Sequence, residues 1–121
     1  MAFTHGNGRM TIHGKPESAT ALQDCSRPTV DWPDRFAEFD ELLGHAWEIR
    51  RPSPTRLEVD LPATVGLAGR LADLFQREAA YCGFFTFELT IVSSEALLVA
   101  ISVTDSKTSV LDALAAGAGP V

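Results

Sequence analysis

Hydrophobic residues recur at helical spacing in three stretches of the chain. The longest covers residues 63–81, with Thr64 in position to cap its start. A shorter stretch covers residues 33–43 and is followed by Gly44, and the last runs from residue 105 or 106 to 117. The apolar face of the longest stretch consists of Leu67, Leu71, Leu74 and Phe75. These spacings predict three helices, and Gly83 is expected to end the longest one in a left-handed conformation.

Four other stretches have the pattern of β-strands: residues 46–51, 56–61, 84–92 and 96–103. In the second of them, three apolar residues alternate with acidic ones, which is typical of a half-buried strand. The Pro-Ser-Pro-Thr segment at residues 52–55 has strong turn chemistry and predicts a hairpin between the first two strands. The polar residues 93–95 predict a second turn.

The predicted order is therefore α-β-β-α-β-β-α. This order indicates an α+β fold in which helices cover one face of an antiparallel sheet of about four strands. The part from residue 56 to 116 overlaps the ferredoxin-like order without its closing strand, so a ferredoxin-like relative is an alternative. Residues 1–20 contain three glycines and no hydrophobic period. We expect them to form a flexible N-terminal arm and residues 21–121 to form a single domain.

Length and charge narrow the class of protein. A chain of 121 residues is the size of one domain. The net charge of −6 and the absence of a Lys/Arg cluster argue against nucleic-acid binding. No apolar run approaches the roughly 18 residues of a membrane span, and the first 20 residues lack the apolar segment of a secretory signal. We therefore expect a soluble cytoplasmic protein whose two cysteines, Cys25 and Cys82, are reduced.

One position on the apolar face of the longest helix is chemically unusual. Continued past Leu74, this face reaches Glu78 and then Cys82. Residues four apart on a helix are neighbours, so a carboxylate and a thiol should lie side by side. Burial of an ionised carboxylate is costly without a partner, and the pair therefore needs an explanation.

Three explanations are open. In the first, Glu78 meets solvent or an arginine such as Arg35, Arg50 or Arg51, and Cys82 only packs. The domain would then be a non-catalytic module for protein interaction or dimerisation, and it could form a homodimer. In another, Cys82 acts as a redox or nucleophilic cysteine with Glu78 as base, although a helix C-terminus is the wrong end for activating a thiol.

The remaining explanation is a metal site. The neighbouring carboxylate and the negative end of the helix dipole both oppose ionisation of Cys82, whereas a bound cation favours it. Because a structural zinc site takes four ligands, Cys25 would be the third ligand and His45 the fourth. Softer ions that accept two or three thiolates would need fewer ligands. The candidate ions are Zn, Cd, Hg and arsenite, bound through Cys82, Glu78, Cys25 and His45.

Residues 78–87 read E-A-A-Y-C-G-F-F-T-F. This segment resembles the pattern E-x-x-C-C-x-F-F-x-F of small, mostly actinobacterial proteins of unassigned function, and the similarity extends from about residue 25 to residue 115. The resemblance implies a shared domain and, from some of its members, a link to heavy-metal or metalloid resistance. Where that pattern has a cysteine pair, this chain has Tyr81 and Cys82. The leading hypothesis is a small binding protein for a thiophilic metal or metalloid.

Overall fold

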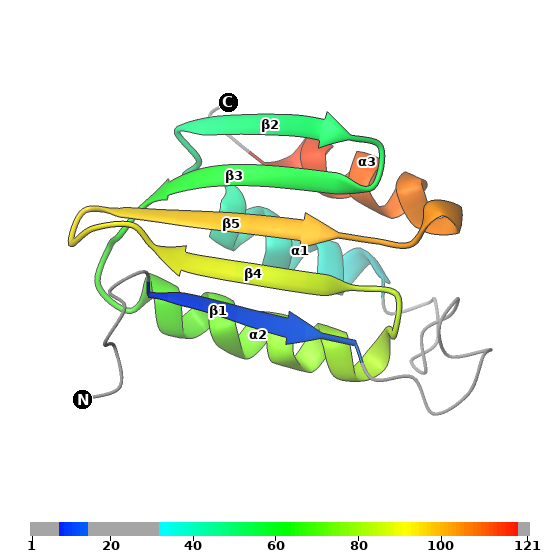
Figure 1. Ribbon diagram of the computed structural model, residues 1–121, viewed down its shortest axis with the longest axis horizontal. Coiled ribbons are helices and arrows are strands. Elements are labelled where there is room, and N and C mark those ends of the chain that lie inside the picture. Colours follow the sequence, from blue (N-terminus) through cyan, green and yellow to red (C-terminus); the bar gives the residue numbers. More distant parts are fainter. Residues whose placement is uncertain (1–7, 15–31, 119–121) are drawn as a thin grey trace.

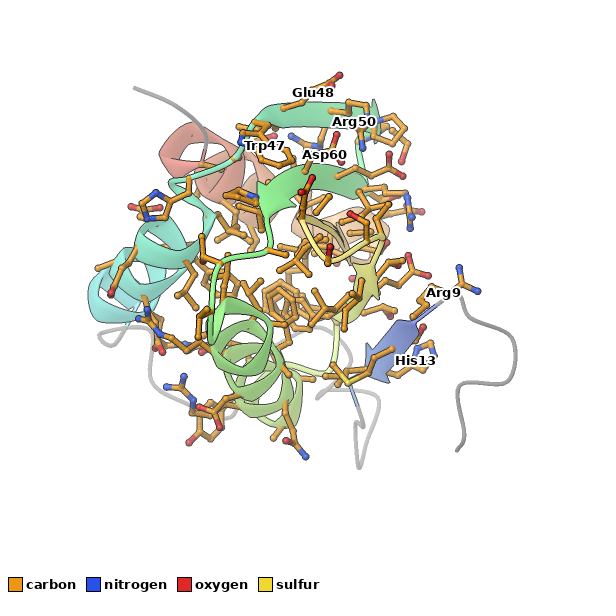
Figure 2. The ribbon with its side chains drawn as sticks, turned by 90° about the vertical axis from the view of Figure 1, so that its left-hand side faces the viewer. Arg9, His13, Trp47, Glu48, Arg50 and Asp60 are labelled. Atoms are coloured by element: carbon orange, nitrogen blue, oxygen red, sulfur yellow. The ribbon has the colours of Figure 1, made fainter. Side chains whose placement is uncertain are left out.

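The computed structural model describes residues 8–14 and 32–118, which form a sheet layer and a helix layer (Figure 1). The elements in chain order are β1 (Arg9–His13), α1 (Trp32–Leu43), β2 (Glu48–Ser53), β3 (Arg56–Pro62), α2 (Leu67–Tyr81), β4 (Thr86–Ile91), β5 (Ala96–Ser102), the 3-10 turn η2 (Asp105–Lys107) and α3 (Thr108–Gly117). All three helices lie on the same side of the sheet (Figure 2). The predicted α+β class and the covering of one sheet face are confirmed.

The five described strands form one sheet in the order β1-β4-β5-β3-β2, and every neighbouring pair is antiparallel. Both predicted hairpins are present, and they join through the pairing of β3 with β5. Because β3 and β4 both run antiparallel to β5, they run in the same direction with β5 between them. Together with α2 they form a split β–α–β unit, which is the extent of the ferredoxin-like character.

The core lies between the sheet and the helices, and alternation along the strands produces it. In β3 the burial alternates strictly, with Leu57, Val59 and Leu61 facing the helices. The centre of the core is aromatic: the rings of Phe75 in α2 and Phe87 in β4 stack at a centroid distance of 4.4 Å. This packing fixes α2 against the sheet and so determines where the residues at its C-terminal end lie.

The predicted number of four strands is wrong, because residues 9–13 form a strand rather than part of a flexible arm. β1 pairs with β4 through all five residues, and its Met10 and Ile12 lie opposite the buried Leu89 and Phe87. The apolar–polar alternation is present in the sequence of β1, but it spans only five residues. Such a short pattern is stabilised mainly by the neighbouring strand.

The ends of α2 also differ from the prediction. The helix begins at Leu67 rather than near residue 63, and its N-cap is Gly66, with φ of 82°, instead of Thr64. Such a φ suits glycine, which has no Cβ to clash with the backbone. At the other end the C-cap is Cys82 in an extended conformation, and Gly83 has no positive φ. The chain therefore leaves α2 at Cys82 itself, whose carbonyl accepts a hydrogen bond from the Phe85 N–H just before β4.

None of the described helices combines the length and the apolar character that crossing a bilayer requires.

Candidate functional site

The candidate site lies where the start of α1 meets the end of α2. Arg35 is on the first turns of α1, four residues before the buried Phe39, and therefore shares the inward stripe of that helix. Glu78 is on the last turn of α2. The two helices run in opposite directions, because Arg77 pairs with Glu38 near this end and Arg70 pairs with Glu41 farther along. This arrangement brings the Arg35 guanidinium onto the Glu78 carboxylate.

Both residues are buried and closely paired. Arg35 is 6% exposed and Glu78 is 1% exposed. The Arg35 Nε donates to both carboxylate oxygens of Glu78 at 3.0 Å, and Nη2 also donates to Oε1. The expectation that Glu78 could meet an arginine such as Arg35 is confirmed, whereas the rest of that explanation, in which Cys82 only packs, stays a prediction. Arg50 and Arg51, the other two candidates, pair elsewhere, with Asp60 and with Asp112.

Cys82 completes the cluster. Its side chain is fully buried, and the Arg35 Nη2 donates to its Sγ at 2.9 Å. The guanidinium carbon of Arg35 also lies 5.9 Å from the centre of the Tyr81 ring. One cation therefore contacts the carboxylate, the sulfur and an aromatic ring at the end of α2. We call Arg35, Glu78 and Cys82 the Arg35 cluster.

Cys82 is disulfide-bonded. The expectation of a reduced thiol is therefore wrong for Cys82 in this structure. The only other cysteine of the sequence is Cys25, which lies outside the described residues.

The electrostatics of the cluster differ from those expected from α2 alone. The sequence placed a carboxylate and the negative end of a helix dipole beside the sulfur, and both oppose a thiolate. Arg35 adds a buried positive charge within hydrogen-bonding distance of the sulfur, and such a charge favours the thiolate once the disulfide is reduced. The charges of Arg35 and Glu78 cancel each other, so these two side chains together add no net charge beside the sulfur. The sulfur is less disfavoured as an anion than α2 by itself indicates.

His45, the fourth predicted ligand, lies at the opposite end of the helix pair. It is exposed, just beyond the end of α1, where it lines a shallow surface pocket with Leu67 and Arg70 from the start of α2. Cys82 follows the end of α2, which has 15 residues and is about 22 Å long. The structure therefore brings Glu78 and Cys82 together but does not bring His45 to them. Within the described ranges, three or more His, Cys, Asp or Glu side chains are nowhere grouped to hold a metal ion.

The position of Arg35 on α1 is visible in the sequence, although the apolar stripe of α2 alone does not point to it. Arg35 and Phe39 are four residues apart and therefore share the inward face of α1. The spacing thus predicts an inward arginine on α1, as it predicts an inward Glu78 on α2. One buried cation and one buried anion on two packed helices predict a pair. Which end of each helix meets the other, however, depends on the tertiary fold.

A second group of charged residues covers the face of the sheet away from the helices. Arg50 binds both oxygens of Asp60, at 2.7 and 3.0 Å, and Figure 2 shows these two residues beside Glu48 at the β2 edge. Arg56 bridges Glu58 on its own strand and Glu88 on β4, each at 2.9 Å. The hydrogen bond from Arg50 lowers the pKa of Asp60, and the hydrogen bond from Arg56 lowers that of Glu58. We call this group the outer charge network; its charges already pair with one another.

The comparisons with known proteins add no assignment: no family matches the chain, and neither a curated protein nor a solved structure shows significant similarity to it.

Proposed function

We propose that this domain binds a thiophilic metal ion or metalloid through a reduced thiol pair, with Cys82 as one ligand and Cys25 as the other. The observation that supports the proposal is the disulfide at Cys82, since a disulfide joins two sulfurs. Cys25 is the only other cysteine in the sequence. Two sulfurs that can bond to each other can, once reduced, bind a single ion between them.

The charges of the Arg35 cluster favour this use of the thiols. Two thiolates carry −2, and Arg35 and Glu78 together carry zero. A divalent ion therefore gives a neutral buried complex, and trivalent arsenic that keeps one hydroxyl does the same. The disulfide and the protonated dithiol are neutral too, whereas a lone thiolate leaves a net charge in a buried site, which is costly. The cluster thus supports three neutral states: disulfide, dithiol and metal complex.

The same geometry indicates which ions suit the site. Both Glu78 oxygens accept hydrogen bonds from Arg35, so we assign Glu78 to holding Arg35 rather than to ligating the ion. His45 is at the other end of α2. A structural zinc ion takes four ligands, and two sulfurs supply only half of them. Hg(II) and arsenite, which accept two thiolates, are therefore favoured over Zn and Cd.

Native mass spectrometry of the full chain, reduced with a sulfur-free phosphine, tests the proposal. We expect a one-to-one adduct with Hg(II) and with arsenite, and weaker retention of Zn. Cys82→Ser and Cys25→Ser should each abolish the adduct, whereas the oxidised wild-type protein, with the same surface, serves as the matched control and should bind nothing. A reduced wild-type protein that retains none of these ions would contradict the proposal and favour a module with a purely structural disulfide.

A second candidate is a thiol–disulfide redox function, favoured by the disulfide itself together with the Arg35 hydrogen bond to Sγ. In this reaction a dithiol reductant supplies two electrons and two protons, the S–S bond breaks, and two thiols form while the reductant becomes a disulfide. Equilibration with glutathione buffers measures the reduction potential. A potential within the cytosolic glutathione range, about −220 to −320 mV, would support a redox role, and a much lower one would indicate a structural bond.

A further inference from the structure

No described strand pairs with the outer edge of β1. In the described part of the chain β1 pairs only with β4, as the last strand of the sheet. The Gly14 N–H donates to the Phe85 carbonyl at 2.8 Å, and this bond determines which β1 residues direct their backbone groups toward β4. Because the backbone groups of a strand alternate between its two sides, Thr11 and His13 direct their N–H and C=O groups away from β4.

The two edges of the sheet differ in how they are protected. At the β2 edge the register shifts between Arg50 and Ser53, Pro52 lies within the strand, and Arg51 bonds to Asp112 of α3. β1 has continuous register through all its pairs and contains neither proline nor a bulge. Natural sheets use bulges, prolines and covering elements to prevent pairing at their edges, and among residues 8–14 and 32–118 none of these devices protects β1.

We propose that β1 pairs antiparallel with β1 of a second copy of this chain, about a two-fold axis at Thr11. This register places Thr11 opposite Thr11 of the second copy, Met10 opposite Ile12, and Arg9 opposite His13. Met10, which is 38% exposed, thereby meets an apolar partner on the helix side of the sheet. Threonine pairs and apolar pairs are both favourable across antiparallel strands. The three central residues of β1 are thus complementary to themselves in reverse, as a two-fold contact between identical chains requires.

The helix beneath β1 also fits a second copy. α2 lies against β1 (Figure 1). One flank of α2 faces α1 and carries Arg70 and Arg77, which bond to glutamates of that helix. At 3.6 residues per turn, the opposite flank carries the half-buried Ala68 and Ala72. These two small side chains allow the α2 helices of the two copies to approach each other under the joined sheet.

Figure 2 shows Arg9 and His13 on the side of β1 that faces away from the helices. Thr11 lies between them on that same face, since it shares their place in the alternation. In the proposed pair, the outer sheet face continues from one copy to the other without a step. The dimer does not depend on the thiol site, because β1 contributes none of the residues of the Arg35 cluster.

Sedimentation analysis of the full chain, from low micromolar to near-millimolar concentration, tests the proposal. We expect reversible dimerisation of the wild-type protein. Thr11→Pro removes the outward N–H without removing a bond to β4, so it should weaken the dimer about tenfold or more and leave the melting temperature nearly unchanged. Thr11→Ala keeps the N–H and is the matched control; it should dimerise as the wild type does. A wild-type monomer at every concentration would overturn the proposal.

Cross-linking provides a second test that does not depend on how Thr11→Pro folds. A two-fold axis at Thr11 brings its two side chains together, so Thr11→Cys should form a covalent dimer on mild oxidation. The control Thr90→Cys, on the same sheet face but one strand inward, should not. Equal cross-linking of both variants, or none with Thr11→Cys, would refute the register. If Thr11→Pro dimerises like the wild type, the edge is not the interface.

Discussion

Arg35 and Glu78 both lose their hydration in the folded state, and the contact between them offsets that loss. Breaking a buried ion pair on one side is much more harmful than replacing the whole pair, because the remaining charge stays buried without a partner. The pair therefore determines the local arrangement of α1 and α2 more than it adds to the overall free energy of unfolding. It also holds the guanidinium against Cys82.

A double-mutant cycle tests this view. Arg35→Leu should lower the free energy of unfolding by about 3–5 kcal/mol, because it leaves the Glu78 carboxylate buried alone, and Glu78→Leu should cost a similar amount. The double variant should lose far less than the sum of the two. Urea titration of the four proteins measures these differences. Additive losses would mean that the two side chains contribute independently, contrary to their geometry.

The residues of the site could be predicted only in part. The apolar stripe of α2 placed Glu78 and Cys82 on the buried face, and both are buried. It did not choose among Arg35, Arg50 and Arg51 as the partner, because that choice depends on contacts between residues more than 40 positions apart. His45 follows the end of α1 and Cys82 follows the end of α2. Because these helices are antiparallel, the two residues lie at opposite ends of the helix pair, which the sequence alone did not predict.

Among the elements, β1 depends on a close backbone approach near the site. A Cβ added at Gly14 would lie 2.5 Å from the Gly83 carbonyl oxygen, and this backbone atom cannot easily move. Gly14→Ala should therefore destabilise the protein by roughly 1–3 kcal/mol.

Gly69, in α2, offers a contrast, because no atom lies within 4 Å of an added Cβ at this position. Gly69→Ala should therefore stabilise the protein by about 0.5–1 kcal/mol through helix propensity. Thermal unfolding of the two variants compares them; the same sign for both would contradict the packing argument.

Local pattern was sufficient for the helices and the two hairpins, since period and turn chemistry are short-range signals. It did not give the strand order. The pairing of β3 with β5 joins residues that are some 40 positions apart, and β1 reaches β4 from near the start of the chain. Only the summed packing of both sheet faces selects these partners.

The outer charge network should make stability depend on pH. The pKa of Asp60 is lowered in the folded state by the hydrogen bond from Arg50. A lowered folded pKa stabilises the protein above the unfolded pKa, about 3.9, and this contribution is lost as the pH falls through the folded value. Because both side chains are about one third exposed, solvent screening limits the effect to less than about 1 kcal/mol. Asp60→Asn should therefore cost stability at neutral pH and little in acid; an equal loss at both would refute the assignment.

For the whole molecule, the redox state of the cysteines should change the free energy of unfolding. If Cys25 is the partner of Cys82, the disulfide closes a loop of more than 50 residues. A loop of that length stabilises a fold by about 4 kcal/mol, mainly by restricting the unfolded chain. Reduction should therefore lower the melting temperature markedly. The fold should persist in the reduced state, because the aromatic core and the Arg35–Glu78 pair do not depend on the disulfide.

An ion that stays bound to both reduced sulfurs closes the same loop, so it restricts the unfolded chain as the disulfide does. Hg(II) or arsenite should thus restore most of the melting temperature lost on reduction, whereas Zn should restore little. Differential scanning calorimetry of the oxidised, reduced and ion-loaded protein measures the three states, and Cys25→Ser serves as the control that no ion rescues. If reduction leaves the melting temperature unchanged, Cys25 does not pair with Cys82. If reduction lowers it but no soft ion restores it, the sulfurs form a structural or redox bond rather than a binding site.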